Sequence, residues 1–200
     1  MKNKSVLLVI DVQNDFCPGG SLAVNGGDEI VTTINAMARD FDHVVLTQDW
    51  HPEGHSSFAS QHKGHEAFTQ IEMPYGPQTL WPDHCIIGTE GAAFHKTLDI
   101  PKAELVIRKG YRKTIDSYSA FFENDHKTPT GLGGYLKERG LTNITCVGLA
   151  FDYCVRYSAE DAKSLGFDVK VIERATRAID LGGTADLTRK SFVERGVTLL

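Results

Sequence analysis

Short apolar runs that alternate with helical patterns constrain the fold of this 200-residue chain more than any other feature. The runs are rich in β-branched residues and end at Gly or polar residues, as strands do: Ser5–Ile10, His43–Thr47, Glu104–Arg108, Asn143–Leu149, Asp168–Ile172 and Val197–Leu199. Helical patterns lie between several of them: Asp28–Arg39, Leu132–Arg139, Tyr153–Leu165 and Thr184–Glu194. Runs such as VLLVI and ITCVGL are apolar on both faces, which is typical of parallel strands covered by helices on each side. We therefore predict an α/β protein with three α/β/α layers and a mainly parallel central sheet of about six strands.

The composition limits the class of protein further. With 41% hydrophobic and 24% charged residues, no repeat and no linker, residues 1–200 are expected to form a single domain. The net charge of −5 and the absence of a Lys or Arg run argue against binding to nucleic acid or to an anionic membrane. The apolar stretch Val6–Ile10 is too short for a membrane span and lacks a signal-peptide cleavage site, so we expect a cytoplasmic protein.

Four reactive residue types stand at the predicted strand ends. Asp11, Asp49 and Lys109 close or follow the first three runs, and Cys154 lies just after the fourth. Taken singly, each has a structural explanation as a turn, surface or core residue. Parallel strands bring their carboxyl ends to one edge of the sheet, where ligands bind in this architecture. We therefore expect these four side chains to meet.

Cys154 is the best candidate nucleophile. It follows a strand and lies in the first turn of a predicted helix, where free N–H groups and a cation such as Lys109 are expected to lower the pKa of its thiol. Asp11 is placed to accept the thiol proton. Cys146, inside a strand pattern, and Cys17, beside Pro18, are interpreted as structural.

A candidate metal site lies in the long segment from Gln48 to about Ile100, which is rich in Gly, Pro and His. Asp49 and His51 point to the same side of an extended chain, and His84 is the best candidate for a third ligand. An Asp/His/His set with open positions suits one catalytic divalent ion, Zn²⁺, Fe²⁺ or Mn²⁺. The alternative is a polar surface loop whose histidines cap turns.

Aromatic residues are also expected at this edge. Phe16, Trp81 and Tyr118 follow or interrupt loops there and offer rings that could stack on a flat substrate, although core packing is the more common role of isolated aromatic residues. Neither Gly-x-Gly-x-x-Gly nor Gly-Lys-[Ser/Thr] occurs, so no nucleotide cofactor is expected.

Four blocks of the sequence, in order, resemble the nicotinamidase/pyrazinamidase enzymes of the isochorismatase-like cysteine hydrolase superfamily: VLLVIDVQNDFCPGGSLAV, LTQDWHPEGHSSFAS, RKG and VGLAFDYCV. The resemblance implies an isochorismatase-like hydrolase fold and a metal-dependent amidase of NAD salvage. Such an enzyme hydrolyses nicotinamide, or pyrazinamide, through a cysteine thioester and needs no organic cofactor.

The resemblance also implies roles for individual residues. Asp11, Lys109 and Cys154 match the catalytic triad, and Asp49, His51 and His84 match the ligands of the divalent metal. The backbone N–H groups of Ala150 and Cys154 match the oxyanion hole, with a cis peptide before Ala150, and Phe16 and Trp81 match the aromatic residues that contact the ring. His55 matches a ligand in some members and a supporting residue in others. Phe151 and Tyr153 depart from the family, which often has a small residue or Thr and a His there.

Two other functions remain open from the sequence. Another amidase of the superfamily, acting on a carbamoyl compound, would use Cys154 without needing the metal. A metal-storage or redox-sensing protein would use the histidines and Cys154 without releasing ammonia. The sequence also leaves open how many subunits the protein has and whether it forms a homo-oligomer.

Overall fold

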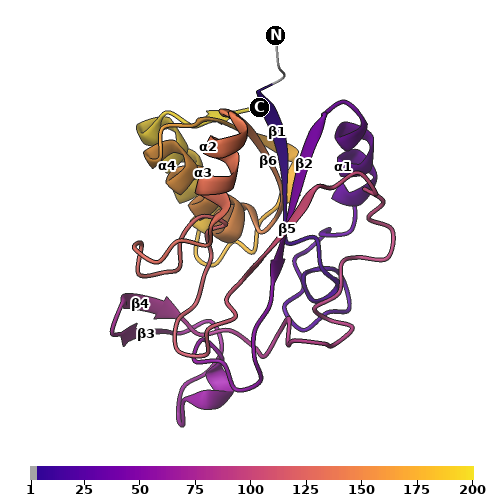
Figure 1. Ribbon diagram of the computed structural model, residues 1–200. Coiled ribbons are helices and arrows are strands. Elements are labelled where there is room, and N and C mark those ends of the chain that lie inside the picture. Colours follow the sequence, from indigo (N-terminus) through magenta and orange to yellow (C-terminus); the bar gives the residue numbers. More distant parts are fainter. Residues whose placement is uncertain (1–3) are drawn as a thin grey trace.

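Six parallel strands form the central sheet of the computed structural model, which describes residues 4–200; the first three residues of the predicted 1–200 domain lie outside it. The spatial order is β5-β2-β1-β6-β7-β8 (Figure 1). The strand bounds are β1 Ser5–Ile10, β2 His43–Asp49, β5 Leu105–Lys109, β6 Asn143–Leu149, β7 Asp168–Arg177 and β8 Thr198–Leu199. All six strands that the sequence predicts are present, and the predicted α/β class is confirmed.

Helices cover both faces of the sheet. On one face lie α2 (Leu132–Arg139), α3 (Arg156–Ser164) and α4 (Thr184–Arg195), and on the other lies α1 (Ile30–Arg39) (Figure 1). The side chains of β1 alternate between the two cores, with Leu8 facing the three helices and Leu7 facing α1. Both are buried, and burying such a side chain stabilises the fold by roughly 1.5–3 kcal/mol. The three predicted layers follow from this two-sided apolar pattern.

The structure differs from the predicted elements in two places. The predicted helix at Tyr153–Leu165 is preceded by a π-helical turn, Phe151–Val155, and α3 begins only at Arg156. An antiparallel hairpin, β3 (Gln70–Met73) and β4 (Gly76–Thr79), interrupts the segment that was predicted as one long loop. The hairpin strands are too short and polar to give an apolar run, so nothing in the pattern marks them.

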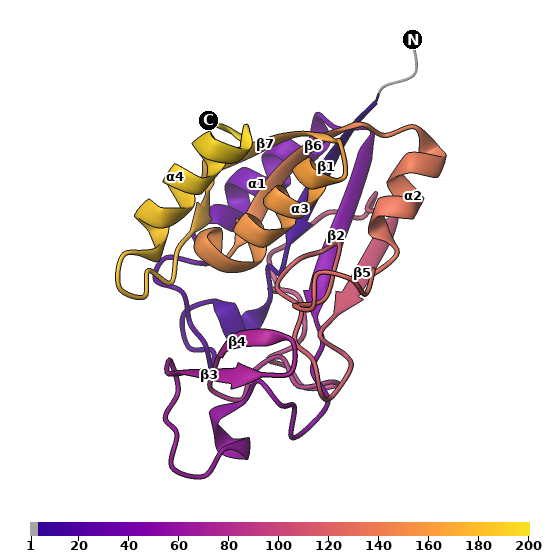
Figure 2. The ribbon, with the colours of Figure 1, turned by 90° about the vertical axis from the view of Figure 1, so that its left-hand side faces the viewer.

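The carboxyl ends of the central strands all point to the same side of the molecule. The hairpin and the loops of residues 48–100 gather there, below the strand ends in both views (Figures 1 and 2). Within the described part of the chain, no helix has the length and apolar character required to cross a membrane. The loops and the hairpin therefore cover one edge of the sheet, and the predicted site residues lie at this edge.

Candidate active site

Asp11, Lys109 and Cys154 form a buried cluster at this edge. The ammonium Nζ of Lys109 lies 2.8 Å from Asp11 Oδ2 and 3.4 Å from Cys154 Sγ. Lys109 and Asp11 are at most 1% exposed, and Cys154 is 6% exposed because it lines a cavity. The fold thus brings together residues that lie far apart in the sequence, since 143 positions separate Asp11 from Cys154.

Local backbone structure fixes the two charged members. Lys109 is the last residue of β5, and its Nζ also donates to the carbonyl of Ser117 at 2.9 Å. Asp11 follows β1 with a φ of 48°, where the chain turns out of the sheet. The hydroxyl of Thr47, on the neighbouring strand, donates to Asp11 Oδ1 at 2.6 Å. One oxygen of Asp11 is therefore held by a neutral donor and the other faces Lys109.

Burial dominates the electrostatics of the Asp11 carboxyl. It raises the pKa of Asp11, and the charge of Asp49 adds to the rise, although Lys109 opposes it. Burial alone would lower the pKa of Lys109, but the carboxylates of Asp11 and Asp49 outweigh it and keep that pKa well above its usual value. Lys109 is therefore a permanent cation, and Asp11 is a carboxylate with an increased affinity for a proton.

The expected lowering of the thiol pKa of Cys154 is wrong for the protein without bound ligands. Burial raises this pKa well above its usual value, and the attraction of Lys109 does not compensate. The turn that carries Cys154 is also π-helical rather than the first turn of an ordinary α-helix. Formation of a nucleophilic thiolate at Cys154 therefore requires a base.

Asp49, His51 and His84 form a second buried cluster beside the first. Asp49 Oδ2 lies 3.1 Å from His51 Nε2 and 3.4 Å from His84 Nε2, and Asp49 Oδ1 lies 3.0 Å from Lys109 Nζ. Each of these three side chains offers one possible ligand atom, and these atoms lie within 4.8 Å of one another, as a metal site requires. Asp49 therefore links the two clusters.

The hydrogen bonds of the two histidines leave the same nitrogen available for a metal. His51 Nδ1 donates to the carbonyl of Gly110 at 2.9 Å, and His84 Nδ1 donates to the carbonyl of Pro82 at 2.7 Å. Because a carbonyl only accepts, each Nδ1 carries a hydrogen and each Nε2 faces Asp49. Such outer hydrogen bonds orient histidine ligands in metal sites. The donor set and its support therefore fit one divalent cation.

Asp49 and His51, the closest pair in this cluster, shift each other's pKa through their charges. Burial opposes ionisation of Asp49, but His51 and Lys109 hold the pKa of its carboxyl well below the usual value. Burial would lower the pKa of His51, yet the adjacent Asp49 raises it above the usual value. A cation bound here has to displace the proton of His51, so binding should be weaker in acid.

His55, whose role the sequence left open, is not a member of this group, but with His51 and Asp116 it forms a second group whose ligand atoms lie close enough to hold a cation. Its Nε2 donates to backbone carbonyls of Arg112 and Ile115, at 2.9 and 3.1 Å, and its Nδ1 lies 2.8 Å from Ser57 Oγ. Both ring nitrogens therefore have protein partners. The imidazole packs against the ring of His51, with centroids 4.3 Å apart.

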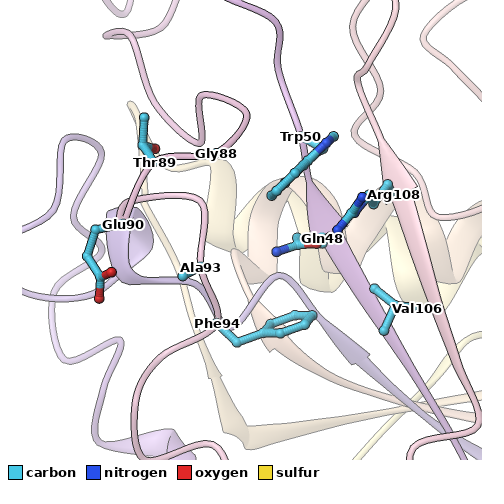
Figure 3. A pocket seen from close by; sticks show the side chains of 9 residues that line it. All are labelled: Gln48, Trp50, Gly88, Thr89, Glu90, Ala93, Phe94, Val106 and Arg108. Atoms are coloured by element: carbon cyan, nitrogen blue, oxygen red, sulfur yellow. Dashed lines mark hydrogen bonds between the residues drawn. The ribbon is translucent and has the colours of Figure 1, made fainter.

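The opposite face of the same strand ends carries no predicted site residue. The ring of Trp50 points away from the metal cluster and stacks with Arg108, whose guanidinium carbon lies 4.0 Å from the ring centroid. Figure 3 shows both side chains beside Gln48 and Val106, lining a surface groove. This confirms the alternation expected from an extended chain, in which Trp50 points away from Asp49 and His51.

A narrow cavity has members of both clusters in its wall. Phe16, Trp81 and Tyr118, all expected at this edge from the sequence, line it together with Tyr153. Tyr153, one of the two departures from the family, packs edge-on against Trp81 with centroids 4.8 Å apart. The other departure, Phe151, is buried in the core against Phe192. The cavity is therefore a narrow space between aromatic rings, with Cys154, Asp49 and His84 in its wall.

The turn before Cys154 has the backbone that the resemblance implied. The Leu149–Ala150 peptide bond is cis, and the carbonyl of Ala150 accepts hydrogen bonds from the N–H groups of Tyr153 and Val155, both at 3.1 Å. Ala150 and Cys154 consequently both line the cavity. Their backbone N–H groups remain the predicted oxyanion hole.

Supporting residues of the site escaped the sequence reasoning. Gln13 and Thr47 are buried beside the two clusters and donate hydrogen bonds to Asp49 and Asp11, respectively. Asp15 and Asp116 are also buried, and their carboxylates accept from the backbone N–H groups of Cys85 and Ser117. Gly110 has a φ of 67°, and a Cβ there would lie 2.4 Å from Cε1 of His51. The one available signal was position, because several of these residues adjoin a strand end or a predicted site residue.

A buried Asp, Lys and Cys cluster at the carboxyl edge of a parallel sheet, next to an Asp/His/His set, is the arrangement expected of a cysteine hydrolase with an α/β fold. Residues 5–199 match the isochorismatase domain, and the chain belongs to this family.

Named relatives narrow the comparison. The chain is 51% identical over 195 residues to a nicotinamidase of Acinetobacter baylyi, covering 98% of this chain and 91% of the relative. Its structure superposes with a TM-score of 0.99 on a nicotinamidase/pyrazinamidase of Acinetobacter baumanii, at 52% identity and covering 100% and 97% of the two chains. A pyrazinamidase of Pyrococcus horikoshii in complex with zinc gives a TM-score of 0.81 at 31% identity, covering 98% of each chain.

Proposed function

We propose that this chain is an amidase that hydrolyses nicotinamide to nicotinate and ammonia, and pyrazinamide to pyrazinoate, with residues 1–200 forming one catalytic domain. The observation that carries the proposal is the position of Cys154 Sγ, 3.4 Å from Lys109 Nζ and in the wall of an aromatic cavity. The names of its relatives, nicotinamidase and nicotinamidase/pyrazinamidase, support the same substrates.

Acylation begins with proton transfer from the Cys154 thiol to Asp11. The thiolate then attacks the carboxamide carbon, forming a C–S bond while the carbonyl electrons move to oxygen. The N–H groups of Ala150 and Cys154 donate to this oxyanion. When the C–N bond breaks, Asp11 returns its proton to the nitrogen, and ammonia leaves a thioester on Cys154.

Deacylation uses the same residues in reverse. Asp11 accepts a proton from a water molecule, whose oxygen attacks the thioester carbon, and the C–S bond breaks to release nicotinic acid, which gives its proton to the solvent and becomes nicotinate. The proton on Asp11 returns to the cysteine sulfur. Lys109 remains charged throughout and compensates the negative charge that moves between Asp11 and Cys154. These steps require no organic cofactor.

Asp49, His51 and His84 are the proposed ligands of one divalent cation, with His55 as a supporting residue that packs on His51. When bound, the cation supplies a coordination position for the ring nitrogen of the substrate, which holds the carboxamide beside Cys154. Zinc is the first choice among Zn²⁺, Fe²⁺ and Mn²⁺, because the Pyrococcus relative was crystallised with it. Phe16 and Trp81 are proposed to contact the pyridine ring.

The proposal is tested by incubating the purified protein with nicotinamide and quantifying both products. Equal amounts of nicotinate and ammonia are expected. A carbamoyl amidase would release ammonia from a carbamoyl compound in preference to nicotinamide, and a metal-storage or redox protein would release none from either. Either result would overturn the proposed activity.

Removing a proposed metal ligand should weaken both metal and substrate binding. We expect Asp49→Ala, His51→Ala or His84→Ala to lower Zn²⁺ affinity by more than roughly 100-fold, because losing an outer partner alone typically costs 10- to 100-fold. Metal content and nicotinamide binding are measured after dialysis, and a chelator should abolish activity until Zn²⁺ is restored. His65→Ala, an exposed histidine of the same segment, is the control and should retain wild-type metal content. Unchanged metal content in all three ligand variants would refute the assignment.

A further inference from the structure

Gln13 is a buried polar residue that takes no part in the proposed reaction. Its side chain is 0% exposed and lies between the two strand ends that carry Asp11 and Asp49. The amide Nε2 donates to the carbonyl of Asp49 at 2.8 Å and to the carbonyl of Ala92 at 2.8 Å. In return, the backbone N–H of Asp49 donates to Gln13 Oε1 at 2.7 Å.

These hydrogen bonds continue the pairing of β1 with β2 beyond the point where the backbone pairing ends. Strand β1 pairs with β2 as far as Val9 and Leu46, and it turns out of the sheet at Asp11. Asp49, at the end of β2, is paired on its other side with Lys109 of β5. A carboxamide carries the same donor and acceptor as a peptide group. The side chain of Gln13 therefore occupies the place of the missing β1 backbone beside Asp49.

We propose that Gln13 is a positioning residue that fixes the backbone of Asp49 and, through it, the orientation of the Asp49 carboxylate toward the metal. With its N–H and C=O both held, Asp49 places one carboxylate oxygen 3.0 Å from Lys109 Nζ and the other 3.1 Å from His51 Nε2. The inference rests on the proposed role of Asp49 as a metal ligand. It adds a residue two positions after the proposed base Asp11.

Gln48 provides a matched control for this role. Its Nε2 donates to the same carbonyl of Ala92 at 2.9 Å, and its Oε1 accepts from Arg108 Nε at 3.1 Å. Gln48 is also buried and lies on the groove side of β2 (Figure 3). Replacing Gln48 therefore removes a buried amide and a bond to Ala92 while both Gln13 bonds to Asp49 stay in place.

The test compares Gln13→Leu, Gln48→Leu and Asp49→Ala with the wild type. Zn²⁺ affinity is measured by competition with a chromophoric chelator, and the thermal midpoint of the metal-free protein is recorded in parallel. Gln13→Leu should weaken Zn²⁺ binding by roughly 10- to 100-fold, the range for outer partners of metal ligands. Gln48→Leu should keep a Zn²⁺ affinity within about threefold of the wild type, even if its thermal midpoint falls as much as that of Gln13→Leu.

The outcomes distinguish the proposed metal site from the proposed positioning role of Gln13. If Asp49→Ala retains wild-type Zn²⁺ affinity, the proposed metal site itself is wrong. If Asp49→Ala loses affinity but Gln13→Leu does not, or if Gln13→Leu and Gln48→Leu lose it equally, the positioning role alone is overturned. Gln13→Met, which keeps the length of the side chain, replaces Gln13→Leu if that variant does not fold. Failure of both Gln13 variants to fold would show a scaffold role and would also overturn the inference.

Discussion

Replacing Cys154 with alanine should lower kcat for ammonia release from nicotinamide by about four orders of magnitude or more, because removing a nucleophile leaves only binding and oxyanion stabilisation. Alanine removes one sulfur atom at the wall of the cavity and leaves the backbone N–H groups of Ala150 and residue 154 unchanged. The proposed metal ligands Asp49, His51 and His84 are also unaltered. The variant should therefore keep its metal content and its circular dichroism spectrum while losing turnover.

Cys146→Ala is the control for this experiment. Cys146 lies within β6, fully buried, and burial raises the pKa of its thiol to about 12. It faces the core rather than the cavity, so the substitution should lower the thermal midpoint with little change in kcat. Ammonia release by Cys154→Ala within tenfold of the control would exclude Cys154 as the nucleophile.

Benzamide should be a far poorer substrate than nicotinamide. The two molecules have nearly the same shape, but benzamide lacks the ring nitrogen that the proposed cation binds. Without that contact the carboxamide is free to misorient relative to Cys154, and positioning of reactants is worth up to roughly 7–11 kcal/mol. We expect kcat/KM to fall by about 100-fold or more, equivalent to about 3 kcal/mol, whereas pyrazinamide should be hydrolysed.

The comparison is made at saturating Zn²⁺ with all three amides, by ammonia release. Comparable kcat/KM values for benzamide and nicotinamide would show that the rings of Phe16 and Trp81 position the substrate without the metal. A loss of the nicotinamide preference in His84→Ala, with Phe16 and Trp81 intact, would support the assigned role of the ring nitrogen.

The fold was largely predictable because its largest stabilising contribution is the burial of apolar side chains on both faces of the sheet. The apolar runs of the sequence show directly which segments are buried in this way. The bounds predicted for β1, β6 and α2 agree with the structure. The hairpin at Gln70–Met73 and Gly76–Thr79 was not predictable, because strands of four largely polar residues leave no periodic pattern.

The candidate site was predictable where residues stand at strand ends. Asp11, Asp49 and Lys109 were placed at one edge by the parallel topology alone, and the structure brings both carboxylates within hydrogen-bonding distance of Lys109 Nζ. The sign of the thiol pKa was not predictable, because it depends on the burial of Cys154 after the loops have closed over the strand ends. The contacts of Gln13 depend likewise on where β1 turns out of the sheet.

The thioester on Cys154 is the central claim, and partitioning of the acyl group between water and hydroxylamine tests it most directly. Nicotinamide and methyl nicotinate are each turned over at one fixed hydroxylamine concentration, and nicotinohydroxamate and nicotinate are quantified. Because both substrates would give the same acylated Cys154, the account predicts the same ratio of hydroxamate to nicotinate from each. Ratios that differ between the two substrates, or nicotinate alone from both, would contradict a common thioester and indicate direct attack of water on the amide.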